Sequence, residues 1–205
     1  TDISLKPSFL SLLEKIIKND KNNSNTFYKN IILNHIFYYD DKNTLTMLIK
    51  NGLDINFKDE DDDTLLIKAC RYSSQNICRF LIENKVDVNA KNKNGITPLI
   101  WAAYKNNTIL TNLLLNNGAD VNLQDNKGRT ALMWANYYDH DINIINILLE
   151  HKANVNLSTI YSWTPLMQAV KNSSNEYMDK VKLLIKSGAD VNAKNDENLT
   201  PFNIA

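Results

Sequence analysis

Few residues in this 205-residue sequence have the types and spacing that catalysis requires. The three histidines, His35, His140 and His151, are separated along the chain and form no cluster. No serine or cysteine lies in the strand-turn-helix context that exposes a hydrolase nucleophile. We therefore predict no catalytic residues, and we expect that the protein is not an enzyme.

The cysteine content argues against a disulfide-stabilised scaffold. Cys70 and Cys78 are the only cysteines, too few to staple a small secreted domain. A free cysteine most often packs as a small apolar residue, so we predict that both are buried, on opposite helices of one structural unit. A reducing or neutral compartment is the default expectation, and cytoplasmic location and secretion into a host cell both stay open.

Two acidic segments look only superficially like metal-binding loops. The run Asp59–Asp63 alternates carboxylates as a calcium loop does, but Thr64 stands where that loop needs glycine and Cys70 where it needs glutamate. The adjacent residues Asp139–Asp141 would point in different directions from an inserted turn. We predict no metal site and no cofactor, and we interpret the acidic run as a solvated tip that faces a partner.

Charge and hydropathy limit the classes of partner. The 23 Lys and Arg residues balance 23 Asp and Glu residues, so the formal net charge is zero. A neutral chain is no general attractor of nucleic acid or anionic lipid. The most apolar stretch, Ile31–Tyr39, is too short for a membrane helix and is interrupted by Asn34 and His35. We expect a soluble monomer that binds neither nucleic acid nor membranes.

The strongest signal in the sequence is an internal period. A tripeptide of Asp or Asn, an aliphatic residue and Asn recurs at intervals of 33, 33, 34 and 36 residues. A threonine follows each tripeptide, ten residues after its first member. The tripeptides begin at Asp54, Asp87, Asp120, Asn154 and Asp190, and the threonines are Thr64, Thr97, Thr130, Thr164 and Thr200. The coincidence of the two registers indicates a repeated structural unit.

Each unit is expected to contain two helices and a hairpin finger. Threonine is a favoured N-cap, and a proline after it, as in Thr97-Pro98, fits the first helical turn. The second helix ends at Gly52, Gly118 or Gly188, where a positive φ is easiest. Polar stretches such as Asn92–Gly95 supply tight turns. Because one pair of short helices cannot bury its apolar faces alone, the units must stack.

These features resemble the ankyrin repeat, with its 33-residue period and a Thr-Pro-Leu helix start, seen here as Thr97-Pro98-Leu99. The resemblance implies an all-α fold with short β-hairpin fingers, an ankyrin-type α-solenoid of stacked helix-turn-helix repeats. We expect residues 1–30 to form an N-terminal capping helix, with its apolar face in residues 9–17, and a degenerate linker. Residues 31–205 would form the array, with repeats starting near 31, 64, 97, 130 and 164 and a partial repeat at 200.

The sequence departs from the family pattern at several positions. The usual histidine after Thr-Pro-Leu is replaced, so apolar packing must take over from its hydrogen bonds. The residues at this position are Ile67, Ile100, Met133, Met167 and Asn203. Lys85 and Lys152 stand where other repeats have glycine, and a left-handed backbone there would cost about 1–2 kcal/mol each, so we expect those two turns to relax. Extra residues at 137–141 and 172–177 would lengthen two loops.

The resemblance also indicates where a partner would dock. In similar proteins, partners usually bind the concave side, against the fingers and the ends of the first helices. Those helix ends are rich in tyrosine here: Tyr38, Tyr39, Arg71, Tyr72, Tyr104, Lys105, Tyr137, Tyr138, Lys171 and Asn172. Tyrosine supplies contact area at little entropic cost and is enriched at recognition surfaces. The alternative is that these rings cap seams between repeats, and we expect Trp101 and Trp134 to be partly buried.

The fourth finger has an unusually apolar tip. Ile160, Tyr161 and Trp163 stand where the preceding finger carries polar residues such as Arg129. We therefore predict a partner-binding surface on fingers and first-helix ends. Its residues are Tyr72, Tyr104, Lys105, Arg129, Tyr137, Tyr138, Ile160, Tyr161 and Trp163.

Together these patterns favour a non-catalytic scaffold that binds a protein partner on its concave face and fingertips. The competing hypothesis is a targeting or regulatory arm of a larger enzyme whose catalytic domain is absent from this chain. A small-ligand receptor would need an enclosed pocket, which an open groove seldom provides. Because the helix that starts at Thr200 lacks a partner helix, we expect the native protein to continue past Ala205 or this segment to pack as an incomplete cap.

Overall fold

The computed structural model describes residues 26–136, 142–171 and 177–205. The chain divides into two compact units, unit 1 with residues 1–86 and unit 2 with residues 87–205. Every regular element in the described residues is a helix, and one isolated antiparallel bridge joins Lys58 to Thr64. The predicted all-α fold of helix-pair repeats is therefore confirmed.

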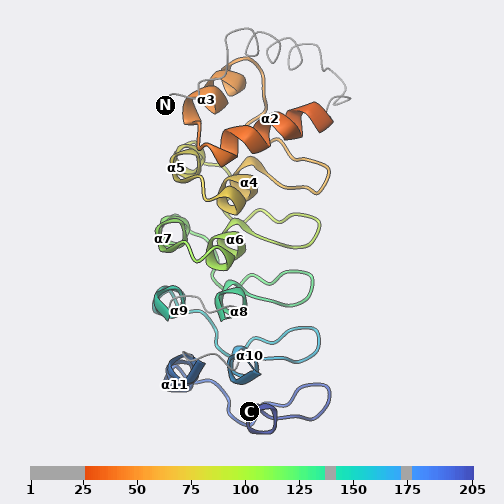
Figure 1. Cartoon of the computed structure of the whole chain (residues 1–205), viewed down its shortest axis with the longest axis vertical. Helices are drawn as coiled ribbons and strands as arrows, with labels where there is room; N and C mark the ends of the chain where they lie inside the picture. Colours follow the sequence, from red (N-terminus) through yellow and green to blue (C-terminus); the bar gives the residue numbers. More distant parts are fainter. Residues whose placement is uncertain (1–25, 137–141, 172–176) are drawn as a thin grey trace. The chain divides into compact units, whose positions relative to one another are not determined.

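The described residues of unit 1 contain two helix pairs. α2 (Thr26–Tyr38) and α3 (Lys42–Lys50) form the first pair, and α4 (Leu65–Tyr72) and α5 (Gln75–Glu83) form the second. α2 packs against α4, and α3 packs against α5. First helices therefore stack on first helices and second helices on second helices (Figure 1).

Unit 2 continues the same pattern with three helix pairs and a short last helix. The elements are α6 (Pro98–Tyr104), α7 (Thr108–Asn116), α8 (Ala131–Asn136), α9 (Ile142–Glu150), α10 (Pro165–Lys171), α11 (Tyr177–Lys186) and α12 (Pro201–Ile204). The first helices α6, α8 and α10 lie in one column, and α7, α9 and α11 lie in another (Figure 1). The hairpin fingers project from the side of the first helices that faces away from the second helices.

Threonine begins the first helices, as predicted. The hydroxyl oxygen of Thr97 accepts a hydrogen bond from the N–H of Ile100 at 3.2 Å, which satisfies a donor that the helix leaves unpaired. Thr64, Thr130, Thr164 and Thr200 each make the same bond three residues onward. Proline is the first residue of α6, α10 and α12, where no N–H is needed.

A left-handed residue follows the second helices, whatever its identity. Gly52, Gly118 and Gly188 have φ angles of 107°, 88° and 91°. Lys85 and Lys152 occupy the same register with φ angles of 59° and 67°, so the expectation that these turns relax is wrong. The turn keeps its shape because backbone hydrogen bonds close it: the N–H of Lys152 donates to Leu149 O at 2.9 Å, and the next N–H donates to Leu148 O at 3.0 Å.

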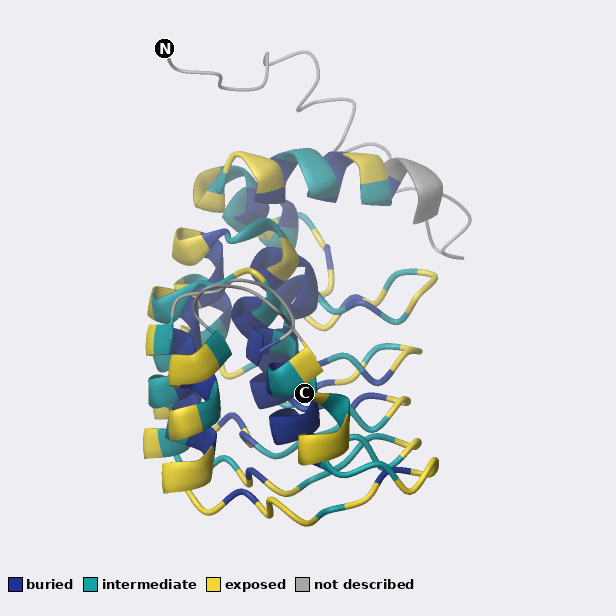
Figure 2. Ribbon diagram, turned by 60° about the horizontal axis from the view of Figure 1, so that its bottom comes forward, coloured by how far each residue is buried: buried dark blue, intermediate teal, exposed yellow. Residues whose placement is uncertain are grey.

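Apolar packing takes the place of the absent histidines. Ile67, Ile100, Met133 and Met167 are each at most 2% exposed. In α12 the equivalent Asn203 instead forms a capping box with Thr200. The first helices of unit 2 are largely buried, while the second helices and finger tips carry the exposed residues (Figure 2).

The recurring tripeptides join consecutive repeats in unit 2. The first residue turns the chain locally, as where Asp120 Oδ1 accepts from the N–H of Asn122 at 2.9 Å. The last residue bonds to the following repeat: Asn89 Oδ1 accepts from the N–H of Asp120 at 2.8 Å, and Asn89 Nδ2 donates to Gly118 O at 3.0 Å. Asn122 and Asn156 make the same two bonds to the repeats that follow them.

The ends of the array differ from its middle. α2 begins at Thr26, so residues 26–30 of the predicted capping segment and linker are helical. Residues 1–25 and the predicted insertions, apart from Tyr177 at the start of α11, lie outside the described residues. α12 packs against α10, and its Phe202 is 87% exposed. No helix in the described part of the chain has the length and apolar character needed to cross a membrane.

Candidate functional site

Five closed fingers precede the first helices. Finger 1 (residues 59–63) belongs to unit 1, and fingers 2 to 5 (residues 92–96, 125–129, 159–163 and 195–199) belong to unit 2. In each finger the N–H of the first residue donates to the carbonyl of the fifth residue at 2.9–3.2 Å. A side-chain oxygen of the first residue also accepts from the N–H groups of the third and fifth residues, as Asp125 Oδ1 does at 2.9 Å each. Each tip is therefore a fixed turn.

Consecutive fingers of unit 2 are bonded to one another. The N–H of Asn126 donates to Asn94 O at 3.0 Å, and the N–H of Ile160 donates to Lys127 O at 3.1 Å. Glycine permits this approach at Gly128, because a Cβ there would lie 2.8 Å from the Cα of Thr159. The fingers hold one another in a row, so side chains at their tips are presented on a rigid support.

The tip of finger 4 presents two apolar side chains to solvent. Ile160 and Tyr161 are 58% and 60% exposed. Their backbone is bonded on both sides, to finger 3 through Ile160 N–H and to finger 5 through Tyr161 O, which accepts from Asp196 N–H at 3.4 Å. Ser162 Oγ adds a hydrogen bond to Asp196 Oδ1. The tip is thus ordered by polar contacts that leave both apolar side chains free to meet a partner.

Trp163 at the base of this finger lies beside the next first helix. Its side chain is half-buried, and the Nζ of Lys171, at the end of α10, lies 5.0 Å from the ring centroid. This distance places an ammonium over an aromatic face, a favourable electrostatic contact. Trp163 therefore has an intramolecular role, with part of its ring still accessible.

An aromatic cluster covers the ends of α6 and α8. The ring of Tyr104 makes edge contacts with Trp101 at 5.5 Å and with Trp134 at 5.3 Å, and all three side chains are half-buried. Lys105 Nζ lies 5.6 Å from the Tyr104 centroid. The prediction that both tryptophans are partly buried is confirmed, and Tyr104 spans the seam between two repeats.

Arg129 joins this cluster from finger 3. Its guanidinium carbon lies 4.0 Å from the centroid of Trp134, and its Nε donates to Asp125 Oδ2 at 2.8 Å. Trp134 Nε1 donates to the same oxygen at 3.2 Å. The Asp125 side chain is 1% exposed and that of Arg129 is 26% exposed. Arg129 is therefore largely committed to internal contacts that fix finger 3 against α8.

Of the residues predicted to bind a partner, Tyr72 lies in unit 1. Tyr72 is half-buried, and its ring stacks against Phe37 with centroids 6.4 Å apart. Tyr38 and Tyr39 are 70% and 48% exposed, and their rings meet edge to face at 5.0 Å. At Tyr72 the structure agrees with the alternative that a ring packs at a seam between helix pairs.

The acidic finger is not wholly solvated, which corrects its interpretation as a free tip. Asp59 Oδ2 lies 2.6 Å from Lys68 Nζ, with side chains 7% and 5% exposed. Asp63 is 2% exposed, and its Oδ2 lies 3.6 Å from Arg71 Nη1. These two carboxylates serve the turn and pair with cations of α4, so only the middle of the run, such as Asp61, faces solvent.

The two cysteines are packing residues, as predicted. Both are 0% exposed and free, with their Sγ atoms 3.7 Å apart. The hydrogen bond with Cys70, followed by burial, raises the pKa of the Cys78 thiol well above its usual value. A thiol held neutral is a poor nucleophile and a poor metal ligand. No group of three or more His, Cys, Asp or Glu side chains could hold a metal ion in the described part of the chain.

The predicted site residues divide into four sets. Tyr104, Lys105 and Arg129 come together in the aromatic cluster, and finger 4 presents Ile160, Tyr161 and Trp163 in the same unit. Tyr72 lies in unit 1, and Tyr137 and Tyr138 lie outside the described residues. We define the finger face as the surface of fingers 2 to 4 and the C-terminal ends of α6, α8 and α10.

Asp125 and its contact with Trp134 were not anticipated from the sequence. The signal was present in the spacing: an aspartate opens the finger, an arginine follows four residues on, and Trp134 lies in the first helix turned toward that finger. An i, i+4 acid and base within a turn indicates an ion pair, but only the fold shows that a third side chain shares the carboxylate.

Within each unit, stacked helix pairs with projecting fingers define the class of protein as a helical repeat protein. The chain belongs to the ankyrin-repeat family: the family's model for three ankyrin repeats matches residues 8–92, 33–125, 70–159 and 99–195. Ankyrin repeats generally mediate protein–protein interaction and are generally non-catalytic.

Two relatives come from the spider Latrodectus tredecimguttatus. The chain is 48% identical over 64 residues to Alpha-latrocrustotoxin-Lt1a, which is 31% of this chain and 4% of that protein. It is 41% identical over 63 residues to Alpha-latroinsectotoxin-Lt1a, 30% of this chain and 4% of that protein. The match therefore spans about 4% of the length of either relative. The similarity concerns a short stretch of repeats and not the rest of those proteins.

Proposed function

We propose that this chain is a non-catalytic scaffold that binds a protein partner through its fingers and first-helix ends. The proposed contact residues are Tyr72 in unit 1 and, in unit 2, Tyr104, Lys105, Arg129, Ile160, Tyr161 and Trp163, with Tyr137 and Tyr138 retained from the sequence register. In unit 2 these residues belong to the finger face.

The observation that carries the proposal is the exposed apolar pair on finger 4. Ile160 and Tyr161 remain more than half exposed although the finger backbone is bonded to both neighbouring fingers. Exposed apolar side chains on an ordered support lose little conformational freedom when a partner covers them, so more of the burial energy goes into affinity. Aromatic residues on rigid elements are the usual anchors of protein interfaces.

The aromatic cluster is a second observation in favour of the finger face as the binding surface. Tyr104 rests edge-on against two tryptophans, so its ring is held in place before any partner arrives. Lys105 is exposed beside it. A partner would meet a half-exposed aromatic platform next to a cation, and Arg129 would act mainly by keeping that platform rigid.

A displayed library of random 12-residue peptides, selected on the full chain, tests this proposal. The affinity of each enriched peptide is then measured by fluorescence anisotropy for the wild type and for the double variant Ile160→Ser/Tyr161→Ser. We expect the variant to bind about tenfold or more weakly, corresponding to a loss of about 1.4 kcal/mol or more. Both substituted side chains are exposed, so the thermal midpoint should change little.

The control replaces two exposed apolar residues of the second helices by serine. Ile109 on α7 and Ile185 on α11 are 53% and 47% exposed. The double variant Ile109→Ser/Ile185→Ser should bind the selected peptides as the wild type does. Equal loss in both variants, or no loss in the finger variant, would show that the finger face is not the binding surface.

A further inference from the structure

We propose that the finger face of unit 2 recognises an acidic segment of its protein partner, one that combines Asp or Glu side chains with apolar or aromatic ones. This inference rests on the proposed function and names the chemistry of the partner. Its starting point is the distribution of charge over three segments, 91–105, 124–136 and 158–171, each of which contains one finger and the first helix that follows it.

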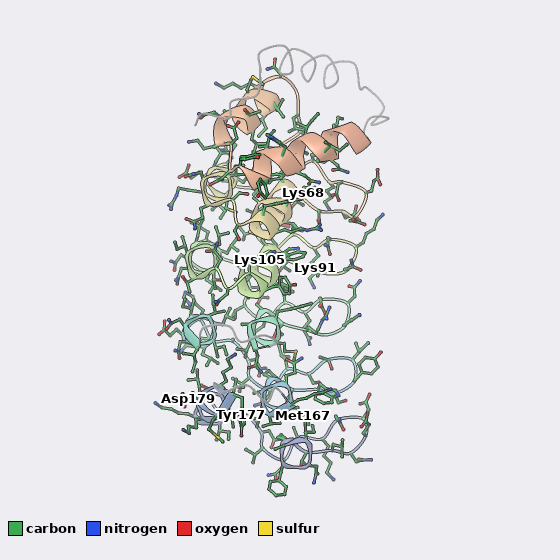
Figure 3. The ribbon with its side chains drawn as sticks, in the orientation of Figure 1. Lys68, Lys91, Lys105, Met167, Tyr177 and Asp179 are labelled. Atoms are coloured by element: carbon green, nitrogen blue, oxygen red, sulfur yellow. The ribbon has the colours of Figure 1, made fainter. Side chains whose placement is uncertain are left out.

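These three segments are strongly unbalanced in charge although the whole chain is neutral. They carry six cations and a single carboxylate, that of Asp125. The cations are Lys91, Lys93, Lys105, Lys127, Arg129 and Lys171. Lys91 directly precedes finger 2, and Lys105 directly follows α6 (Figure 3). A chain with zero net charge has thus gathered positive charge on the elements that form one face.

The one carboxylate cannot offset the lysines around it. Asp125 accepts from two backbone N–H groups, from Arg129 Nε and from Trp134 Nε1. Its side chain is 1% exposed, so solvent and a partner both meet the cations instead. With Asp125 and Arg129 neutralising each other, the remaining charge on these segments comes from lysine.

In each of the three repeats, one of these cations lies over an aromatic ring. Lys105 Nζ lies 5.6 Å from the Tyr104 centroid, Arg129 Cζ lies 4.0 Å from that of Trp134, and Lys171 Nζ lies 5.0 Å from that of Trp163. Tyr104 and Trp134 also touch each other at 5.3 Å. The rings hold the cations at defined places, because an ammonium over an aromatic face is attracted to it.

In the described residues of unit 2, the acids other than Asp125 lie on other elements, and Asp139, Asp141 and Glu176 lie outside the described residues. Asp120 and Asp190 belong to the tripeptides and accept their own repeat's N–H groups. Asp179 on α11 lies 3.4 Å from Lys182. The last finger adds Asp196, whose carboxylate accepts from Ser162 Oγ. Within the finger face itself, positive charge and aromatic surface therefore occur together.

A partner that complements this face brings carboxylates to the lysines and apolar side chains to the rings and to the tip of finger 4. Complementary charge raises the rate of association and selects among partners. An acidic peptide is favoured over nucleic acid, because few cations are present, the chain has no net positive charge, and the family generally binds proteins.

The peptides enriched from the random 12-residue library provide the test. We expect them to carry net negative charge together with apolar or aromatic residues. Raising NaCl from about 50 to 300 mM should weaken their binding several-fold, because exposed charges are screened over a shorter distance. The full-length double variant Lys105→Glu/Lys171→Glu should bind them about tenfold or more weakly than the wild type does.

The control reverses two lysines on a second helix. Lys182 and Lys186 on α11 are exposed, and Lys182→Glu/Lys186→Glu makes the same change in net charge. This control should bind like the wild type. If Lys105→Glu/Lys171→Glu lowers the thermal midpoint, the pair Lys105→Gln/Lys171→Gln replaces it and should still weaken binding measurably.

Three outcomes would overturn the inference. Enriched peptides that are neutral or basic but still depend on Ile160 and Tyr161 would leave the proposed function standing and remove the acidic preference. Acidic peptides that bind both charge-reversed variants equally would place their recognition elsewhere. A 15-residue oligothymidine that binds as tightly as the best acidic peptide at about 150 mM NaCl would show recognition of polyanions in general.

Discussion

Aspartate and asparagine side chains act mainly as hydrogen-bond partners of the backbone in this chain. They occupy the first position of four fingers and of all five tripeptides, where a short side chain can reach an N–H two residues on. An aspartate can therefore be important for stability at one position and unimportant two residues away, as we expect for Asp59 and Asp61 in the acidic finger.

Asp59→Ala is expected to destabilise the protein by about 3–5 kcal/mol. The change removes the acceptor for two backbone N–H groups and leaves Lys68, whose side chain is 5% exposed, without its carboxylate. Urea unfolding measures the loss. Asp61→Ala is the matched control, because Asp61 is exposed, and should stay within about 0.5 kcal/mol of the wild type. Similar losses in both variants would contradict the buried-pair account.

The buried thiols predict a pH dependence of stability. The pKa of Cys78 is raised in the folded state, first by the hydrogen bond with Cys70 and then by burial. The folded state therefore holds this proton more tightly than the unfolded state, whose thiol pKa is about 8.5. This contribution to stability is complete below about pH 8 and declines as the pH rises above about 8.5.

Urea unfolding at neutral and alkaline pH checks this expectation. Cys78→Ala should be less stable than the wild type at pH 7, because it leaves a small cavity, but should lose less stability between about pH 7 and 9.5. An equal alkaline loss in the variant and the wild type would mean that other groups cause it.

At the scale of the element, the turns of each repeat keep their backbone conformation even where the residue disfavours it. The left-handed turn after each second helix persists with lysine in place of glycine, at Lys85 and Lys152. The reason is cooperative: the hydrogen bonds of the turn and the packing of the following repeat together exceed the local cost of the backbone angle. The backbone at Lys85 and Lys152 is therefore strained, and substitution by glycine should relieve this strain.

Lys152→Gly should therefore stabilise unit 2, by about 0.5–1 kcal/mol after allowance for the greater freedom of glycine in the unfolded chain. Gly118→Lys is the reverse experiment at the same register. A Cβ at Gly118 would meet nothing within 4 Å, so its cost is purely conformational. We expect a loss of similar size by urea unfolding. Destabilisation by Lys152→Gly would show that the lysine side chain contributes more than its backbone costs.

The tripeptide asparagines should contribute to stability only where another repeat follows. Asn156 accepts from Asp190 N–H at 2.8 Å and donates to Gly188 O at 3.0 Å. Asn156→Ala is expected to cost about 0.5–1.5 kcal/mol, because two solvent-accessible hydrogen bonds to the next repeat are lost. Asn192 occupies the same register in the last repeat of the chain, where no following repeat offers these bonds, so Asn192→Ala should change the unfolding free energy by less than about 0.5 kcal/mol.

At the scale of the whole molecule, stability depends on the interfaces between neighbouring repeats. Leu166 in α10 is 2% exposed, whereas Phe202, at the same register in α12, is 87% exposed. Val191 is 46% exposed, although Val155 at the equivalent position is 6% exposed. The last repeat thus presents the apolar side of a repeat interface, which a further helix pair would cover.

Extending the chain after Ala205 with a copy of residues 136–171, which supplies the partner helix of α12 and then the next finger and first helix, should raise the thermal midpoint by several degrees. The gain should disappear when Phe202→Asp is introduced into the extended chain, because an unpaired carboxylate would be buried. In the 205-residue chain the same substitution should cost little, since Phe202 is exposed. An unchanged midpoint on extension would contradict the interface account.

The sequence by itself determined that the chain is built from repeats, and it determined the starts of the first helices that a threonine caps. Local rules suffice for these features: a threonine caps a helix at Thr97 or Thr164 wherever that segment folds, and a period of about 33 residues requires like units to stack. The exposed tip at Ile160 and Tyr161 was predictable for the same reason, because it breaks the polar pattern of the other fingers.

Only the tertiary structure decided which side chains share one environment. Asp59 and Lys68 form a pair, and Asp125 joins Arg129 to Trp134, through contacts between a finger and a helix that sequence spacing does not specify. The conformation at Lys152 was likewise decided by the turn and the repeat around it, against the preference of the residue. Local preferences amount to about 1 kcal/mol each, and packing between repeats outweighs them wherever the two disagree.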